Sequence, residues 1–178
     1  MLPKQTNSNT SNFLKLEKGQ TELLIVSDTI QGHQAWMENN TCIKQRDEFQ
    51  LPIEGIKMVD KKDKDGNIIG QEPDRPQFFW ATVVYNFSSK RFEVAQFTQA
   101  TIRKELRALV ENDKWGDPTR KYTVTIGKTG EGFQTRYSLT PNPKPSNATQ
   151  RKEMAKILAE YDADPMDVER MMFGSELD

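Results

Sequence analysis

The chain of 178 residues has a single cysteine, Cys42, and a single histidine, His33. A disulfide within the chain needs two cysteines, so none is expected. A Cys/His zinc site needs about four ligands, and only two such residues are present. Cys42 lies between "ENNT" and "IKQRDEF", without a local pattern typical of a catalytic nucleophile, so a Cys–His catalytic pair is not expected either. Few cysteines also fit a reducing compartment.

Long apolar runs are missing as well. No segment approaches the ~20 apolar residues of a membrane-spanning helix. The start, "MLPKQTNSNTSN", lacks the apolar core of a signal peptide. Hydrophobic residues make up 35% and charged residues 29% of the chain, and the mean hydropathy is −0.78. We therefore expect a soluble, cytoplasmic domain with no membrane partner.

Motifs for phosphate, metal and calcium chemistry are incomplete. Gly127-Lys128-Thr129 could end a phosphate-binding loop, but Tyr122 stands where the loop's first glycine belongs. The segment "KKDKDGNIIGQE" matches several positions of a calcium loop, but Lys61 replaces its first carboxylate. A magnesium nuclease would use Asp74 and Glu93 with a lysine two residues later, where Ala95 stands. We therefore expect no cofactor, no metal and no catalytic residue.

The net charge of −1 conceals an uneven distribution. From Ile157 to Asp178 there are seven acidic residues and one base, a net charge of −6. The other 156 residues hold 24 bases and 19 acids, a net charge of +5. This pattern indicates a basic body with an acidic end.

Composition divides the chain into three parts. Residues 1–12 are rich in Asn, Ser and Thr and have no apolar anchor, which predicts a disordered arm. Residues 13–145 hold the strands and one helix. The proline-rich linker "PNPKPSNAT" then marks the boundary to residues 146–178, a helical acidic segment. Within that segment Met154, Ile157, Leu158 and Tyr161 form one stripe of a helix.

The stretch Gln77–Phe97 predicts an aromatic β-hairpin. Alternate side chains of a strand point to opposite faces, so Phe79, Val83, Tyr85 and Phe87 share one face. Phe78 and Trp80 share the other face with polar Thr82 and Asn86. Those two rings either form a second buried layer or lie exposed as a platform.

A helix and two strands follow the hairpin. Ile102, Leu106, Leu109 and Val110 recur at helical spacing, and Thr98 is the expected N-cap. Earlier, "TELLIVSD" and "IQGHQAWM" predict strands, with a bend at Gly32. Asp65-Gly66 predicts the turn of a small hairpin. Short strands with one inserted helix indicate a mainly β fold, an OB-like β-barrel with a C-terminal helical, acidic tail.

Aromatic and basic residues are interleaved along these strands. Single-stranded nucleic acids bind to such surfaces because bases stack on rings and phosphates pair with Lys and Arg. The residues expected to contact DNA are Trp36, Lys44, Arg46, Phe78, Trp80, Lys90, Arg91, Lys121, Lys128 and Arg136.

Three segments resemble bacteriophage single-stranded-DNA-binding proteins of the OB-fold type. They are "FLKLEKGQTELLIVSD", the stretch from "FFWATVVYNF" to "WGDPT", and "YTVTIGKTGEGFQTRYSLTPNPKP". The resemblance implies a non-enzymatic protein that binds single-stranded DNA during phage DNA replication or recombination, in the host cytoplasm. It also implies an acidic C-terminal tail that recruits replication or recombination proteins. Some relatives carry a structural zinc, whose ligands this chain lacks. A homo-oligomer is possible.

One alternative stays open at this point. The aromatic residues could instead form a protein interface, making the chain a phage interaction module that inhibits or recruits a host protein. A magnesium nuclease is disfavoured by its incomplete motif.

Overall fold

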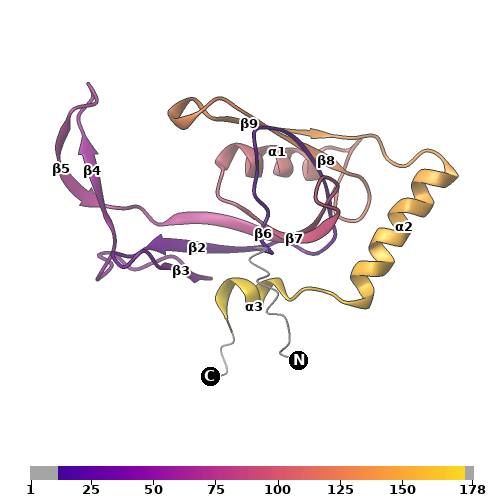
Figure 1. The fold of residues 1–178 in the computed structure, drawn as a ribbon, viewed down its shortest axis with the longest axis horizontal. Helices are drawn as coiled ribbons and strands as arrows, with labels where there is room; N and C mark the ends of the chain where they lie inside the picture. The colour runs from indigo at the N-terminus through magenta and orange to yellow at the C-terminus, as the bar shows by residue number, and fades with distance from the viewer. Residues whose placement is uncertain (1–11, 175–178) are drawn as a thin grey trace, which may run out of the picture.

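The computed structural model describes residues 12–174 and shows a mainly β protein (Figure 1). Seven strands form one antiparallel sheet in the order β3-β2-β6-β1-β8-β9, with β7 on the second edge of β6, while β4 and β5 form a separate two-stranded sheet. The strands are β1 (Gly19–Ile25), β2 (Ile30–Trp36), β3 (Cys42–Gln45), β4 (Met58–Lys62), β5 (Ile68–Pro73), β6 (Gln77–Asn86), β7 (Arg91–Phe97), β8 (Val124–Thr129) and β9 (Arg136–Pro141). The helices are α1 (Ala100–Glu111), the 3-10 turn η1 (Gly132–Gln134), α2 (Ala148–Ala163) and α3 (Val168–Phe173).

β6 organises the sheet because both of its edges are paired. One edge pairs with β7, and the other pairs first with β2 and then with β1, so that Gln34 lies opposite Gln77 and Leu23 lies opposite Asn86. β1 and β2 are thus two halves of one bent strand, interrupted between Ile25 and Ile30. The predicted aromatic hairpin is confirmed as β6 and β7.

The sheet does not close into a barrel. Among residues 12–174 no strand pairing joins β7 to β9. The segment before β1 lies between those parts: the Leu14 N–H donates to the Val94 carbonyl of β7 at 2.8 Å, and Lys128 Nζ of β8 donates to the Leu16 carbonyl at 3.1 Å. A mainly β fold with an inserted helix was predicted correctly, whereas the expected strand-closed barrel is not formed.

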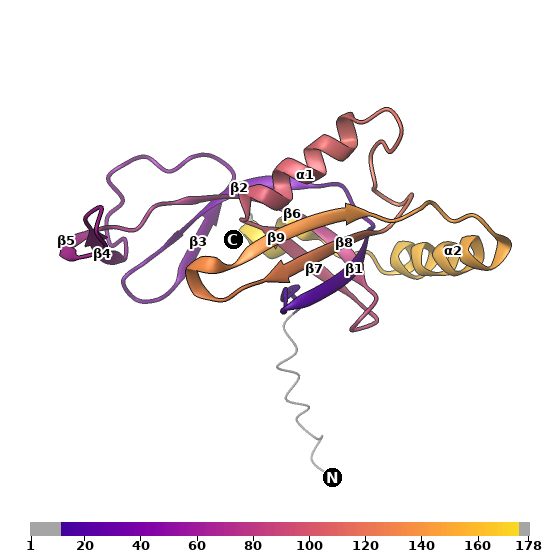
Figure 2. The same ribbon diagram turned by 90° about the horizontal axis from the view of Figure 1, so that it is seen from above.

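One face of the sheet packs on α1. Ile102, Leu106 and Leu109 of α1 are buried in a cluster with strand residues of β1, β6, β7, β8 and β9. The helix begins at Ala100 after Gln99, so Thr98 is not its N-cap as predicted, and Val110 at the end of the apolar stripe is 51% exposed. Figure 2 shows α1 lying across the sheet on this side. We call this the α1 face.

The other face packs on α2 and α3, and we call it the α3 face. Ile157, Tyr161, Val168 and Met172 are buried there against β6 and β7. Figure 1 shows α1 and α3 on opposite sides of β6. The stripe predicted for α2 is confirmed, and the two helices belong to the folded core.

Gly32 was expected to bend its strand, and this prediction was wrong. It lies inside β2 and is buried. A Cβ atom at this position would lie 2.8 Å from Cζ of Phe79 and 2.8 Å from Cζ of Phe173. Glycine is therefore favoured at this position because the rings of Phe79 and Phe173 approach the strand closely.

The β4–β5 hairpin and α2 lie at opposite ends of the long axis (Figure 1). The hairpin turn is shaped by Asp63, whose carboxylate accepts hydrogen bonds from the N–H groups of Asp65 and Asn67, both at 2.9 Å. These bonds, that from Asn67 above all, lower the pKa of Asp63. The hairpin predicted around Asp65-Gly66 is confirmed. Within residues 12–174 no helix has the length and apolar character needed to cross a membrane.

Candidate functional site

The α1 face carries two aromatic rings with an arginine over each. The Arg103 guanidinium lies 5.1 Å from the Phe78 ring centroid, and the Arg107 guanidinium lies 5.5 Å from the Trp80 ring centroid. The spacing of the two arginines along α1 matches the spacing of the two rings along β6. Four residues of a helix rise about 6 Å, and two residues of a strand rise about 6.7 Å. Attraction between a cation and a ring holds each pair together.

The two rings thus form a second packed layer that is still partly open. Both side chains are half-buried, and Trp80 packs against the cluster beneath α1. This answers the question raised by the β6 alternation: Phe79 and Val83 pack on the α3 face, and Phe78 and Trp80 pack on the α1 face.

The two arginines differ in the hydrogen bonds that their guanidinium groups donate. Arg103 donates to the backbone carbonyls of Thr98 at 2.6 Å, Phe97 at 3.2 Å and Phe78 at 3.3 Å. Burial, and secondarily the charge of Arg107, lower the pKa of Arg103. Arg107 is exposed, and within the described part of the chain it donates no hydrogen bond to the protein. Arg103 therefore fixes the helix to the strand, whereas the donors of Arg107 are not used within the described part of the protein.

A cavity of about 410 Å³ lies beside Trp80 and Arg107. We call it the Trp80 hollow. It is bounded by the bent connection between β1 and β2, by α1, and by the loop before β8. The lining residues are Ile25, Asp28, Thr29, Ile30, Gln31, Trp80, Leu106, Arg107, Val110, Asp117, Pro118 and Thr119.

Further rings lie toward the end of the molecule that carries the β4–β5 hairpin. His33 lies on the same face as Phe78, with the two ring centroids 5.2 Å apart. Phe133 in η1 is 94% exposed, and Lys62 Nζ of β4 lies 5.3 Å from its ring centroid. This contact brings the β4–β5 hairpin and the β8–β9 turn together.

Three of the predicted contact residues lie on the α3 face. The register pairs Trp36 with Cys42 and Lys44 with Gln34, one residue out of phase with His33 and Phe78. Lys44 Nζ lies 5.0 Å from the Phe13 ring centroid, and burial lowers the pKa of Lys44. The Arg46 guanidinium lies 4.9 Å from the ring centroid of Phe173 and pairs with Glu169 at 3.0 Å. These two cations thus hold α3 and the N-terminal segment.

The remaining predicted cations are scattered. Lys90 and Arg91 lie at the β6–β7 turn, at the opposite end of β6 from Phe78, and Arg91 pairs with Glu93 at 3.2 Å. Lys128 donates to the Leu16 carbonyl, and Arg136 donates to the Thr135 carbonyl at 3.0 Å. Lys121 is exposed just before β8. Of the ten predicted residues, Phe78 and Trp80 lie together on the α1 face, and Trp36, Lys44 and Arg46 lie on the α3 face.

Arg103, Arg107 and Phe133 were missed from the sequence. The two arginines are four residues apart on α1, next to the apolar stripe, and this spacing is the signal that could have found them. Phe133 stands alone in a glycine-flanked turn, where an aromatic residue has no core to join.

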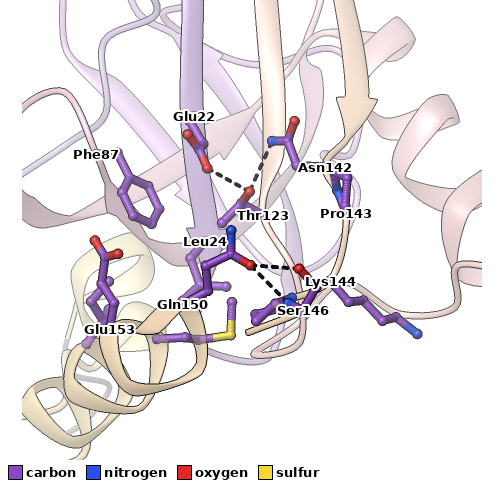
Figure 3. A pocket seen from close by; sticks show the side chains of 13 residues that line it. Glu22, Leu24, Phe87, Thr123, Asn142, Pro143, Lys144, Ser146, Gln150 and Glu153 are labelled. Atoms are coloured by element: carbon purple, nitrogen blue, oxygen red, sulfur yellow. Dashed lines mark hydrogen bonds between the residues drawn. The ribbon is translucent and has the colours of Figure 1, made fainter. Parts of the chain in front are cut away.

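A second cavity, of about 510 Å³, lies between the sheet, the proline-rich linker and the start of α2 (Figure 3). We call it the linker hollow. Thr123 Oγ1 donates to a Glu22 carboxylate oxygen at 2.8 Å and accepts from Asn142 Nδ2 at 3.0 Å. Glu153 of α2 and Phe87 also line it. The residues that line this cavity include two carboxylates, Glu22 and Glu153, and a single lysine, Lys144, so the cavity suits phosphate poorly.

Within residues 12–174 no group of three or more His, Cys, Asp or Glu side chains is placed to hold a metal ion. Comparison with protein-family models, curated proteins and solved structures found no match to this chain.

Proposed function

We propose that this chain binds single-stranded DNA without catalysis, along the α1 face. The observation that carries the proposal is the pair of half-buried rings, Phe78 and Trp80, beside Arg107, whose donors are not used by the described protein. A base stacks on an aromatic ring whatever its identity, at about 1–3 kcal/mol per base. A guanidinium binds a phosphate through two parallel hydrogen bonds.

The strand connectivity supports an OB-like interpretation. A five-stranded OB barrel with its inserted helix is often partly open. When β3, β4 and β5 are left aside as an insertion, the element order here is the one expected of that fold: the bent β1–β2 strand, β6, β7, α1, β8 and β9. Oligonucleotides bind such folds across strands two and three and the loops after strands one and four. Those loops correspond here to residues 37–76 and to the turn holding Phe133, which meet at the Lys62–Phe133 contact. A role in phage replication or recombination rests on the sequence resemblance.

The test is a titration of the full chain with a mixed-sequence single strand, followed by fluorescence anisotropy at two salt concentrations. We expect binding that weakens with salt, because each phosphate contact releases counterions. Arg107→Gln should reduce the slope of log affinity against log salt by about one. Lys90→Ala, which removes a cation at the far end of β6, is the matched control and should change the slope less.

Trp80→Ala tests the stacking directly. We expect affinity to fall by a factor that corresponds to about 1–3 kcal/mol, with cooperative unfolding retained. Absence of binding to single strands at low salt would refute the proposal, and so would an equal affinity for a duplex of the same sequence.

A second candidate function is favoured by the β4–β5 hairpin. Ile68 and Ile69 are 63% and 58% exposed, and Met58 at the start of β4 is 40% exposed. An exposed strand with apolar side chains is a surface for a protein partner. An interaction module would be supported by two results together. The chain would bind no nucleic acid, and Ile68→Ser and Ile69→Ser would abolish its binding to a protein partner.

A further inference from the structure

The Trp80 hollow lies next to the proposed DNA path, and its chemistry is selective. We propose that it receives one base turned out of the bound strand, and that it favours a base with an exocyclic amino group, such as cytosine, over thymine. This inference rests on the proposed function, because it concerns the same strand on the same face.

The shape of the hollow fits a flat, mostly apolar ring. Trp80 forms one wall, and Ile25, Leu106 and Pro118 contribute apolar surface from three other segments. Its volume of about 410 Å³ lies within the ~300–1,000 Å³ range of small-molecule sites. A base in this hollow would contact the indole and leave water, which favours stacking over exposure.

The polar groups of the hollow are dominated by acceptors. Asp28 and Asp117 both line it. One oxygen of Asp117 accepts from the Thr119 N–H at 2.9 Å, and in the described residues its second oxygen and both oxygens of Asp28 accept no hydrogen bond. An ionised carboxylate only accepts, so its matching partner is a donor.

Bases differ in the donors that they present. Cytosine carries the N4 amino group and adenine carries the N6 amino group, whereas thymine presents O4, an acceptor, at the corresponding position. The one donor of thymine on that edge, N3–H, lies between the acceptors O2 and O4, so a carboxylate that accepts from it also faces an acceptor, whereas an amino group offers two N–H donors. Asp28 and Asp117 therefore disfavour thymine and favour cytosine.

The charges in the Trp80 hollow favour the base of a nucleotide over its phosphate. The hollow holds two carboxylates and one cation, Arg107, so its interior repels phosphate. Arg107 lies over the Trp80 ring, where its guanidinium can bind the backbone of a nucleotide whose base enters the hollow. The linker hollow has two carboxylates but lacks an exposed arginine stacked on a ring, so it does not offer this combination.

The experiment measures affinities of the full-length chain for oligo-dC and oligo-dT of equal length at pH 7.5, by fluorescence anisotropy. Two pyrimidines of similar size are compared because oligo-dA stacks on itself. We expect oligo-dC to bind about fivefold to tenfold more tightly, at the lower end of the range that one base contact supplies. The measurement needs no variant, so a failure to fold cannot obscure it.

Two variants then assign the preference. Asp28→Asn and Asp117→Asn replace an acceptor by an amide that also donates, so each should bring the dC/dT ratio closer to one. Glu153→Gln makes the same chemical change in the linker hollow and should leave the ratio unchanged.

The outcomes separate this inference from the proposed function. Equal affinity for oligo-dC and oligo-dT, or a preference that neither aspartate variant alters, overturns the inference while binding itself stands. Failure of every single strand to bind overturns the proposed function and the inference with it.

Discussion

Gly32→Ala tests whether α3 packs on the sheet. If it does, the α3 face is covered and the α1 face is the one free to bind DNA. The new Cβ would lie 2.8 Å from Cζ of Phe79 and of Phe173, whereas carbon atoms pack best at about 3.5–4.0 Å. Phe79 is fully buried and Phe173 is half-buried near the end of the described chain, so Phe173 is the ring that gives way.

The expected magnitude follows from two opposing effects. Overpacking costs about 1–3 kcal/mol, and alanine recovers about 0.4–1 kcal/mol by restricting the unfolded chain. We therefore expect a net loss of about 1–2 kcal/mol in the free energy of unfolding. For a domain of this size that loss lowers the melting temperature by about 2–8 °C.

A double-mutant cycle makes the test specific. In a Phe173→Ala background one of the two clashing rings is gone, so Gly32→Ala should cost at least about 0.5 kcal/mol less than in the wild type. Gly127→Ala is the matched control: this buried β8 glycine meets the side-chain ends of Ser138 and Gln20, and its cost should not depend on Phe173.

The readouts are chemical unfolding, followed by circular dichroism, and DNA affinity well below the melting temperature. An equal cost of Gly32→Ala in both backgrounds would refute the packing of Phe173 on β2. Affinity should stay unchanged, because Gly32 lies on the α3 face. A loss of affinity in a folded variant would place the DNA on that face instead.

Three further predictions concern the acidic end, a surface ion pair and an exposed ring. Ending the chain at Ser146 should lower the melting temperature, because four buried side chains of α2 and α3 are lost from the core; an unchanged melting temperature would show that these helices are dispensable. The hydrogen bond from Arg120 lowers the pKa of Asp162 in the folded protein. The ionised Asp162 therefore stabilises the fold at pH values above the ordinary aspartate pKa of about 3.9. This stabilisation disappears as the pH falls through the lower pKa of the folded state. Asp162→Asn should therefore lose less melting temperature between pH 7 and pH 3 than the wild type, and an identical pH profile would contradict this. Phe133→Ala should leave the melting temperature unchanged and weaken single-strand binding by about 1 kcal/mol or more, whereas unchanged affinity would remove this ring from the DNA path.

Local patterns predicted the elements well. The alternation in Gln77–Phe97 predicts the β6–β7 hairpin, because the whole signal lies within one short stretch. The apolar stripes of α1 and α2 were found for the same reason. Such patterns describe which side of an element is apolar, and they do not describe what covers it.

The arrangement of the elements could not be predicted in the same way. Both faces of β6 are apolar because helices cover both, and alternation alone does not reveal which helix covers which face. The missing closure between β7 and β9 depends on where the segment before β1 lies.

The candidate site was predicted in part. Phe78 and Trp80 were selected because they share a strand face with polar residues. Arg107 was missed because its place over Trp80 depends on the position of α1 relative to β6. Lys44 and Arg46 were selected for their charge, although each lies over a ring on the α3 face.

The β4–β5 hairpin has a consequence for the architecture of this chain as a scaffold. The Asp74 N–H donates to the Lys57 carbonyl at 2.8 Å, so the two ends of the hairpin lie side by side, and its strands pair only with each other. The closure entropy of a loop grows slowly with its length, and each doubling costs only about 0.6 kcal/mol. The hairpin is thus a separate insertion that can be shortened, lengthened or exchanged while the seven-stranded sheet keeps its register. A change in that one insertion would alter how far the hairpin extends from the sheet.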